Sequence, residues 1–218
     1  MPFIVFEGGE GSGKSTQGAL LAQSLRNKGL TVLETREPGG TPLAEDIRKV
    51  FKSVPISGDT PTPRTELLLV MAARSQHIEK TIKPALARNE WIICDRFLDS
   101  SYIYQGFRGG IEKKEIDSVA RPILGALQPD LTLVLRVSTE TAHDRVASRP
   151  GTELDRLDSE LLKDASLHAA FEALVKSSTP YPDGRVPRRV LLDGQGTPEQ
   201  VHARIVDALQ DVFGKILK

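Results

Sequence analysis

The residues best suited to chemistry in this sequence form a glycine-rich stretch near its beginning. The spacing G-x-x-x-x-G-K-[S/T] of a phosphate-binding loop is met by Gly8, Gly13, Lys14 and Ser15. Glycines let successive backbone N–H groups curl around phosphate oxygens, while the positive end of the following helix points at them. Lys14 would reach the β- and γ-phosphates of a nucleotide, and the Ser15 hydroxyl would bind Mg²⁺.

The residues around this loop have the pattern that the motif requires. Residues 3–6 form a short apolar run that predicts a buried strand, and apolar residues at helical spacing follow from Ala19 to Leu25. A glycine- and serine-rich linker could match the spacing by accident, but it would need neither the strand nor the helix. We therefore favour the phosphate-binding loop.

Strands and helices alternate along the rest of the chain. Further strands are predicted at residues 30–34, 91–94, 131–137 and 190–192. The longest helix is predicted at about 65–88, with Pro84 expected to kink or shorten its end. Other helices are expected to start from Thr41 and from Thr139 as N-caps, and the last helix is expected to open with Thr197. Two more helices are expected over 113–127 and 159–176. Residues 100–110 could be a binding loop or a helix start. This alternation predicts an α/β fold, a single domain of residues 1–218 with a five-stranded parallel sheet flanked by helices.

The overall composition narrows the functional classes. The chain has 218 residues, with 29 basic and 29 acidic side chains, so net charge gives no support for binding nucleic acid or a membrane surface. A single cysteine, Cys94, excludes an internal disulfide framework and fits a reducing compartment. We see no signal peptide and no apolar run of transmembrane length. We expect a soluble cytoplasmic protein without nucleic-acid or membrane partners.

Charged residues also follow the predicted strands. Asp95 comes directly after the apolar run 91–94, where a Walker-B-type acid would hold Mg²⁺ directly or through water. A helix cap or a turn is the alternative on spacing alone, because aspartate is common in turns. Arg36 and Glu37 follow the second strand and would face the same end of the sheet. The sequence has no N-K-x-D loop, which disfavours a guanine-specific GTPase.

Four segments together resemble bacterial thymidylate kinases. They are EGGEGSGKST at 7–16, TREPGGT at 35–41, DRF at 95–97 and SSYIYQG at 100–106; the resemblance extends to ELDR at 153–156 and then weakens. It implies a P-loop kinase fold, in-line transfer of the γ-phosphoryl group from ATP to dTMP with Mg²⁺, and a homodimer formed by packed helices. It also implies that ATP is bound by Gly8, Gly9, Glu10, Gly11, Ser12, Gly13, Lys14, Ser15 and Thr16.

The resemblance assigns roles on the acceptor side as well. Arg48 and Arg96 would hold the dTMP phosphate with their rigid donor forks, and Arg74 would bind a thymine carbonyl. Glu37 would organise the water or metal beside the acceptor. Ser101 and Gln105 would contact the pyrimidine edge, and Tyr104 would pack under the sugar so that a 2′-hydroxyl is disfavoured. The implied metal ligands are Ser15 and Asp95, and the implied catalytic residues are Lys14, Glu37, Arg96 and Arg149.

A basic segment at about 145–157 is similar to the short mobile lid of this family. Positions 9–12 of the phosphate loop carry no basic residue, so the resemblance implies that the lid supplies the arginine of the transition state. Arg149 is our first choice, with Arg145 and Arg156 as alternatives, and Glu10 would pair with a lid arginine on closure. A solvated, charged helix end is the simpler interpretation of the same segment.

The sequence departs from the family pattern at two positions. Val70 stands where a phenylalanine usually stacks on thymine, and Arg136 stands where an aspartate is commoner. Adenine contacts are expected around 193–197. Two other functions stay open: a kinase for another acceptor, such as dUMP or a deoxynucleoside, and a nucleotide-dependent switch that only hydrolyses ATP.

Overall fold

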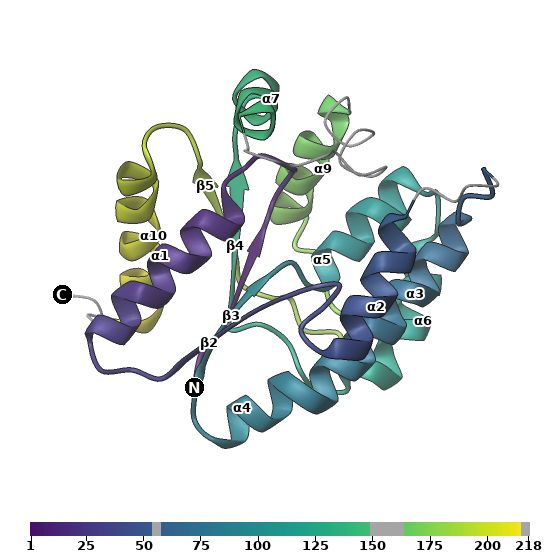
Figure 1. Ribbon diagram of the computed structural model, residues 1–218, viewed down its shortest axis with the longest axis horizontal. Coiled ribbons are helices and arrows are strands. Elements are labelled where there is room, and N and C mark those ends of the chain that lie inside the picture. Colours follow the sequence, from purple (N-terminus) through teal and green to yellow (C-terminus); the bar gives the residue numbers. More distant parts are fainter. Residues whose placement is uncertain (54–57, 149–163, 215–218) are drawn as a thin grey trace.

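A parallel sheet forms the centre of the molecule. The computed structural model describes residues 1–53, 58–148 and 164–214 (Figure 1). In these residues five strands pair in parallel in the order β2-β3-β1-β4-β5. Their bounds are β1 Phe3–Glu7, β2 Val32–Arg36, β3 Trp91–Asp95, β4 Leu131–Arg136 and β5 Arg189–Asp193. The predicted α/β fold with a five-stranded parallel sheet is confirmed.

Helices cover both faces of this sheet. Figure 1 shows α1 (Lys14–Asn27) and α10 (Pro198–Phe213) on one side and most of the other helices on the opposite side. Side chains alternate along β1 accordingly: Ile4 and Phe6 pack with α1 and α10, while Phe3 and Val5 join the other core. The remaining helices are α2 Pro42–Lys52, α3 Pro63–His77, α4 Lys83–Ala87, α5 Leu98–Ser101, α6 Lys113–Leu124, α7 Thr139–Ala147 and α9 Ala165–Lys176.

The long helix predicted at residues 65–88 is not continuous. α3 ends at His77, a π-helical segment η1 spans Ile78–Ile82, and α4 follows from Lys83. Pro84, in the first turn of α4, explains the interruption because it cannot donate a backbone hydrogen bond and its ring crowds the preceding turn. A second π-helical segment, η2 Tyr102–Arg108, follows α5, so residues 100–110 are mostly helical.

Local sequence signals predicted most helix and strand ends to within two residues of their positions in the structure. Thr41 and Thr197 cap α2 and α10, as predicted. The expectation for Thr139 was wrong by one residue: Ser138 caps α7, and its hydroxyl accepts from the backbone N–H of Thr141. Both residue types are good caps, so composition could not separate them. β2 runs over 32–36 rather than 30–34, because Gly29 and Leu30 belong to the turn after α1.

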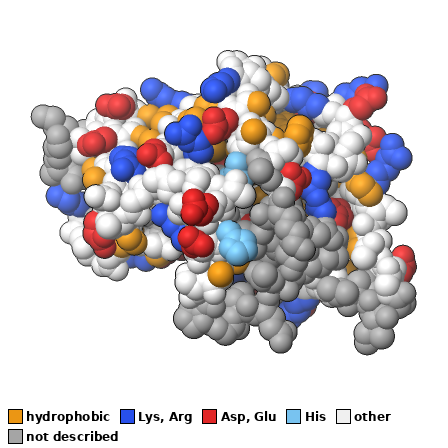
Figure 2. Space-filling model, turned by 90° about the horizontal axis from the view of Figure 1, so that it is seen from above, with side chains coloured by type: hydrophobic (Ala, Val, Ile, Leu, Met, Phe, Trp, Pro, Cys, Tyr) orange, Lys and Arg blue, Asp and Glu red, His pale blue; other side chains and the backbone are white. Residues whose placement is uncertain are grey.

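The strand register brings the important loops together. Phe6 of β1 and Arg36 of β2 both lie beside Asp95, the last residue of β3. The chain therefore leaves β1, β2 and β3 at one edge of the sheet, as ligand sites of open parallel sheets require. Seen from above, acidic and basic side chains of the described residues are intermixed on this face (Figure 2). None of the helices in the described ranges is long and apolar enough to cross a membrane.

Candidate active site

The predicted phosphate-binding loop joins β1 to the first turn of α1. Gly8 has φ 136° and Gly11 has φ 73°, and a Cβ at either position would overlap a neighbouring backbone carbonyl group. The side chain of Lys14 folds back over the loop, where Nζ donates to the carbonyl oxygens of Gly8 at 3.2 Å and Gly9 at 2.8 Å. The loop thus has the shape that presents backbone N–H groups and one ammonium group to phosphates.

The two predicted metal ligands meet at the mouth of this loop. The Ser15 hydroxyl donates to Asp95 Oδ2 at 2.6 Å, although 80 positions separate these residues in the chain. In the described part of the chain no cluster of three or more His, Cys, Asp or Glu side chains could hold a metal by itself. A hydroxyl and a carboxylate nevertheless fit Mg²⁺, which takes few protein ligands and completes its shell with water and nucleotide phosphates.

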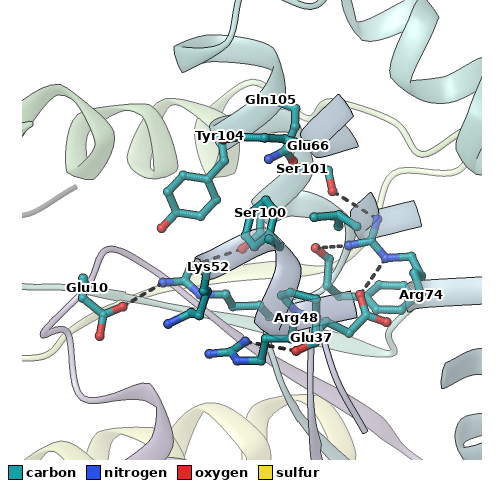
Figure 3. Close-up of a pocket in the computed structure, with 15 residues that line it drawn as sticks. Glu10, Glu37, Arg48, Lys52, Glu66, Arg74, Ser100, Ser101, Tyr104 and Gln105 are labelled. Atoms are coloured by element: carbon teal, nitrogen blue, oxygen red, sulfur yellow. Dashed lines mark hydrogen bonds and ion pairs between the residues drawn. The ribbon is translucent and has the colours of Figure 1, made fainter. Parts of the chain in front are cut away.

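Two cavities meet beside the loop. The first, called the loop cavity, includes Lys14, Ser15 and Asp95 in its walls. The second, called the inner cavity, lies between α2, α3 and α5 (Figure 3). Both cavities share a set of residues that we call the junction: Glu10, Glu37, Arg48, Lys52 and Arg96.

Arg96 ties the junction to the phosphate loop. Its backbone has φ 73°, a left-handed conformation that is uncommon for a residue with a side chain and often marks functional sites. Its guanidinium group donates to the carbonyl oxygen of Gly8 at 3.1 Å, to the Ser100 hydroxyl at 3.2 Å and to Glu10 at 3.3 Å. It also lies 5.0 Å above the ring of Tyr104. Arg96 is therefore held where the two cavities join.

Arg48 is a second cation at the junction. It extends from α2, and its Nη1 donates to the carbonyl oxygen of Pro38 at 3.0 Å. Burial, followed by the nearby charges of Arg36 and Arg96, lowers the pKa of Arg48. Like charges crowd this point of the structure, which favours the binding of an anion.

A buried ion pair supports the wall of the inner cavity. Glu37 Oε2 accepts from Arg74 Nε at 2.6 Å, and Glu37 Oε1 lies 3.0 Å from His77 Nδ1. The three side chains are at most 1% exposed. Burial raises the pKa of Glu37, but Arg74 and His77 outweigh it and lower the pKa overall. Glu37 thus holds Arg74 in place. The direct role of Glu37 beside the acceptor stays a prediction.

The other residues predicted on the acceptor side also line the inner cavity. Arg74 Nη1 donates to the Ser101 hydroxyl at 3.1 Å, and Gln105 lies on the same wall. The buried hydroxyl of Tyr104 has no hydrogen-bond partner within the described ranges. Val70 also borders the cavity, and the ring of Phe97 lies 5.3 Å from the Arg74 guanidinium. The structure therefore brings all of the residues predicted on the acceptor side together around the inner cavity.

Comparison with known proteins identifies the family. A family model described as "Thymidylate kinase" matches residues 6–181. The chain belongs to the thymidylate kinase family. It is 42% identical over 207 residues to the thymidylate kinase of Pseudomonas putida strain W619, covering 95% of each chain. It is also 46% identical over 158 residues to that of Alcanivorax borkumensis, covering 72% of this chain and 74% of the relative.

A solved structure agrees with this membership. The crystal structure of thymidylate kinase from Ehrlichia chaffeensis matches with a TM-score of 0.70 and 30% identity, over 96% of this chain and 98% of that one. The P-loop kinase fold that the sequence predicted is confirmed. The resemblance to thymidylate kinases, which the sequence placed on four segments, is confirmed as well.

A third cavity, called the outer cavity, also borders the phosphate loop. Gly13, Thr16, Gly194 and Gly196 are among its lining residues, which places the loop 193–197 beside the phosphate loop. Arg145 of α7 spans this cavity: its guanidinium group donates to the carbonyl oxygens of Ser12, Gly194 and Gly196. The adenine contacts predicted at 193–197 stay a prediction, which this geometry supports.

Most of the predicted lid lies outside the described residues. These include Arg149, Arg156 and every residue from 149 to 163. Arg145, the alternative catalytic arginine, belongs to α7 and lines the outer cavity, away from the junction. Glu10, expected to pair with a lid arginine, accepts from Arg96. Arg136 forms a loose ion pair of 3.7 Å with Glu172 of α9.

Replacing Arg145 by alanine is expected to raise KM for ATP about tenfold, while kcat changes much less. Its guanidinium group connects two loops that border the outer cavity, and the loss of charge-assisted hydrogen bonds of this kind costs roughly 1.5–3 kcal/mol. Steady-state kinetics at varied ATP measures both constants. Arg136→Ala, which removes an exposed arginine with only a loose partner, is the control. A fall in kcat at unchanged KM would instead support Arg145 as the catalytic arginine.

Sequence reasoning missed Glu7, the last residue of β1. Its buried carboxylate accepts from the backbone N–H groups of Phe97 and Ser100, at 2.8 and 3.0 Å, and from the Ser100 hydroxyl at 2.6 Å. Glu7 thus holds the start of α5 against the strand that leads into the phosphate loop. Burial raises the pKa of Glu7 to about 7, although Arg96 opposes the shift. The sequence did carry a signal for Glu7, because an acidic residue ends an otherwise apolar strand.

The stability of the protein is expected to depend on pH through Glu7. Its pKa is higher in the folded state than the ordinary value of 4.5, so between these values the folded state binds more protons than the unfolded state. The contribution of Glu7 to stability is present below pH 4.5 and is lost as pH rises to about 7. Relative to wild type, Glu7→Gln should therefore gain about 2–3 kcal/mol of unfolding free energy between pH 4.5 and 8.

Urea unfolding of wild type and Glu7→Gln at several pH values tests this expectation. The difference between the two unfolding free energies is the relevant quantity, because other titrating groups cancel in it. A difference that stays constant with pH would show that Glu7 titrates near its ordinary value.

Proposed function

We propose that the protein transfers the γ-phosphoryl group of ATP to dTMP, giving dTDP and ADP. The observation that carries this proposal is the junction. There a phosphate-binding loop and a separate inner cavity share residues, and three of these, Arg48, Lys52 and Arg96, are cations. A protein that only hydrolyses ATP would not need a second cavity that shares cations with the phosphate-binding site.

On the donor side, the triphosphate of ATP would lie in the loop cavity. The phosphate loop and Lys14 would bind its phosphates, and adenine would extend toward the outer cavity. Ser15 and Asp95 would hold Mg²⁺, which when bound neutralises charge on the phosphate oxygens. Together these groups would fix the γ-phosphate at the junction.

On the acceptor side, the inner cavity is lined by hydrogen-bonding side chains, and it has cations where it meets the loop cavity. Arg74, Ser101 and Gln105 would contact thymine, and Tyr104 would pack against the deoxyribose. Arg48 and Arg96 would bind the phosphate of dTMP at the junction. This orientation points the acceptor oxygen at the γ-phosphate.

The reaction then needs no covalent enzyme intermediate. A phosphate oxygen of dTMP attacks the γ-phosphorus in line with the bond to ADP, and negative charge spreads over the transferred oxygens. Positioning of the two phosphates and neutralisation of that charge by the junction cations would supply the rate increase. We also propose, from the family resemblance, that Arg149 supplies a further positive charge to the transition state.

We also propose a cytoplasmic homodimer. Leu43 and Val50 lie two turns apart on α2, and Leu68 lies on α3, which packs against α2. These three apolar side chains are more than half exposed, which suits a face that a second copy covers. Light scattering during size-exclusion chromatography measures the mass; a monomer at micromolar concentration would contradict this part of the proposal.

An acceptor panel tests the proposed activity. The protein is incubated with ATP and Mg²⁺ and with dTMP, dUMP, dCMP, UMP, AMP, GMP or thymidine, and the phosphorylated products are resolved. We expect dTDP to dominate. Preference for another acceptor would preserve the ATP site but overturn the assignment of the inner cavity. ATP hydrolysis without any phosphorylated acceptor would support a nucleotide-dependent switch.

A further inference from the structure

Lys52 is a cation at the junction to which the sequence motifs gave no role. It is the last residue of α2, one helical turn after Arg48, so the two side chains lie on the same face of the helix. Like Arg48, it lines both the loop cavity and the inner cavity. Figure 3 shows Lys52 and Arg48 extending together toward Glu10.

Cations outnumber carboxylates among the residues of the junction: Arg48, Lys52 and Arg96 stand against Glu10 and Glu37. Glu37 is also held by Arg74 and His77, and Glu10 accepts from Arg96. The nearby cations Arg36 and Arg96 contribute to the lowered pKa of Arg48, after the effect of burial, which indicates a locally positive potential. A phosphate dianion is the ligand that such a site fits.

The helix dipole offers a simpler explanation for a lysine at the end of α2, and Lys49 in the same turn allows a comparison. Lys49 and Lys52 both lie in the last turn of α2, where a positive charge interacts favourably with the helix dipole. Lys49 is exposed, forms an ion pair of 2.7 Å with Asp46 and lies outside both cavities. The dipole therefore accounts for a lysine in this turn, but it does not account for a lysine that reaches the junction.

We propose that Lys52 is a catalytic residue that binds the phosphate of the acceptor nucleotide and stays in contact with it during transfer. This inference rests on the proposed function, since it assigns Lys52 to the acceptor of that reaction. The phosphate loop has no basic side chain at positions 9–12, so Lys52 adds positive charge from the acceptor side where the loop supplies none.

Binding of dTMP compared with thymidine tests the proposal. Removing a charge-assisted hydrogen bond to phosphate costs roughly 1.5–3 kcal/mol, so Lys52→Ala should weaken dTMP binding about 10- to 100-fold. Thymidine lacks the phosphate, and its affinity should not change. Titration calorimetry measures dTMP, and competitive inhibition measures thymidine. Lys52→Arg should retain much of the affinity, and Lys49→Ala, on the same helix turn, should bind both ligands as wild type does.

Steady-state kinetics adds a second readout. For Lys52→Ala, kcat/KM for dTMP should fall by at least the same factor as the affinity, while KM for ATP stays within about twofold of wild type. Unchanged dTMP affinity, or an equal loss for dTMP and thymidine, would overturn the role of Lys52 while leaving the proposed function intact. A wild-type protein that neither binds nor phosphorylates dTMP would overturn the proposed function itself, and this inference with it.

Discussion

Lys14→Met is expected to lower kcat for phosphoryl transfer by at least about 10³-fold, the largest catalytic effect of any single substitution in this site. The ammonium group is held over the phosphate loop by two backbone carbonyl oxygens, and the Lys14 residue is only 6% exposed. Burial and then the charge of Arg96 lower the pKa of Lys14, while Glu10 and Asp95 oppose this shift. A cation kept in this place interacts most strongly with charge that develops on the γ-phosphate.

Single-turnover and steady-state rates measure the effect of Lys14→Met. The control is Lys28→Met, which changes an exposed lysine at the other end of α1. Both variants should have wild-type circular dichroism and thermal unfolding. A kcat within tenfold of wild type for Lys14→Met would mean that the loop does not bind the transferred phosphate.

Arg74→Met is expected to lower the unfolding free energy by about 3–5 kcal/mol and to abolish measurable dTMP binding. The variant leaves the carboxylate of Glu37, 1% exposed, with the imidazole of His77 as its remaining partner of this pair of contacts. It also removes the donors to Ser101 and to the carbonyl oxygen of Phe97, which shape the inner cavity. The predicted loss is large because an unpaired charge would stay buried.

The double variant Glu37→Gln/Arg74→Met separates the two effects. Without the buried carboxylate, most of the lost stability should return, whereas dTMP binding should not, because the guanidinium group is still missing. Urea unfolding and titration calorimetry measure the two quantities. If Arg74→Met is within 1 kcal/mol of wild type, water or another cation replaces Arg74, and the ion pair does not support the cavity.

The sequence predicted the fold and the phosphate loop because their signals are local. The spacing of Gly8, Gly13 and Lys14 and the apolar run before them depend on neighbours in the chain. The interruption of the helix was also encoded locally, by Pro84, which was predicted to kink or shorten the helix only near its end, whereas the change begins after His77. A proline near the end of a long helical pattern is better read as a change of helix geometry.

The parts that sequence reasoning missed depend on tertiary contacts. His77 lies three positions after Arg74, a spacing that puts both on one helix face, but the shared partner Glu37 comes from a distant loop. Glu7 meets α5 only because the register of β1 and β3 places Phe6 beside Asp95. The contacts of Arg145 beside the outer cavity were not predicted either, because their partners Gly194 and Gly196 are distant in the chain.

A structure of the protein with dTMP and a non-hydrolysable ATP analogue tests the central claim most directly. We predict that the dTMP phosphate lies at the junction between Arg48, Lys52 and Arg96, with its attacking oxygen about 3–3.5 Å from the γ-phosphorus. The thymine would then contact Arg74 in the inner cavity. A dTMP phosphate bound away from the junction, or a γ-phosphate that does not face the inner cavity, would contradict direct transfer between these two cavities.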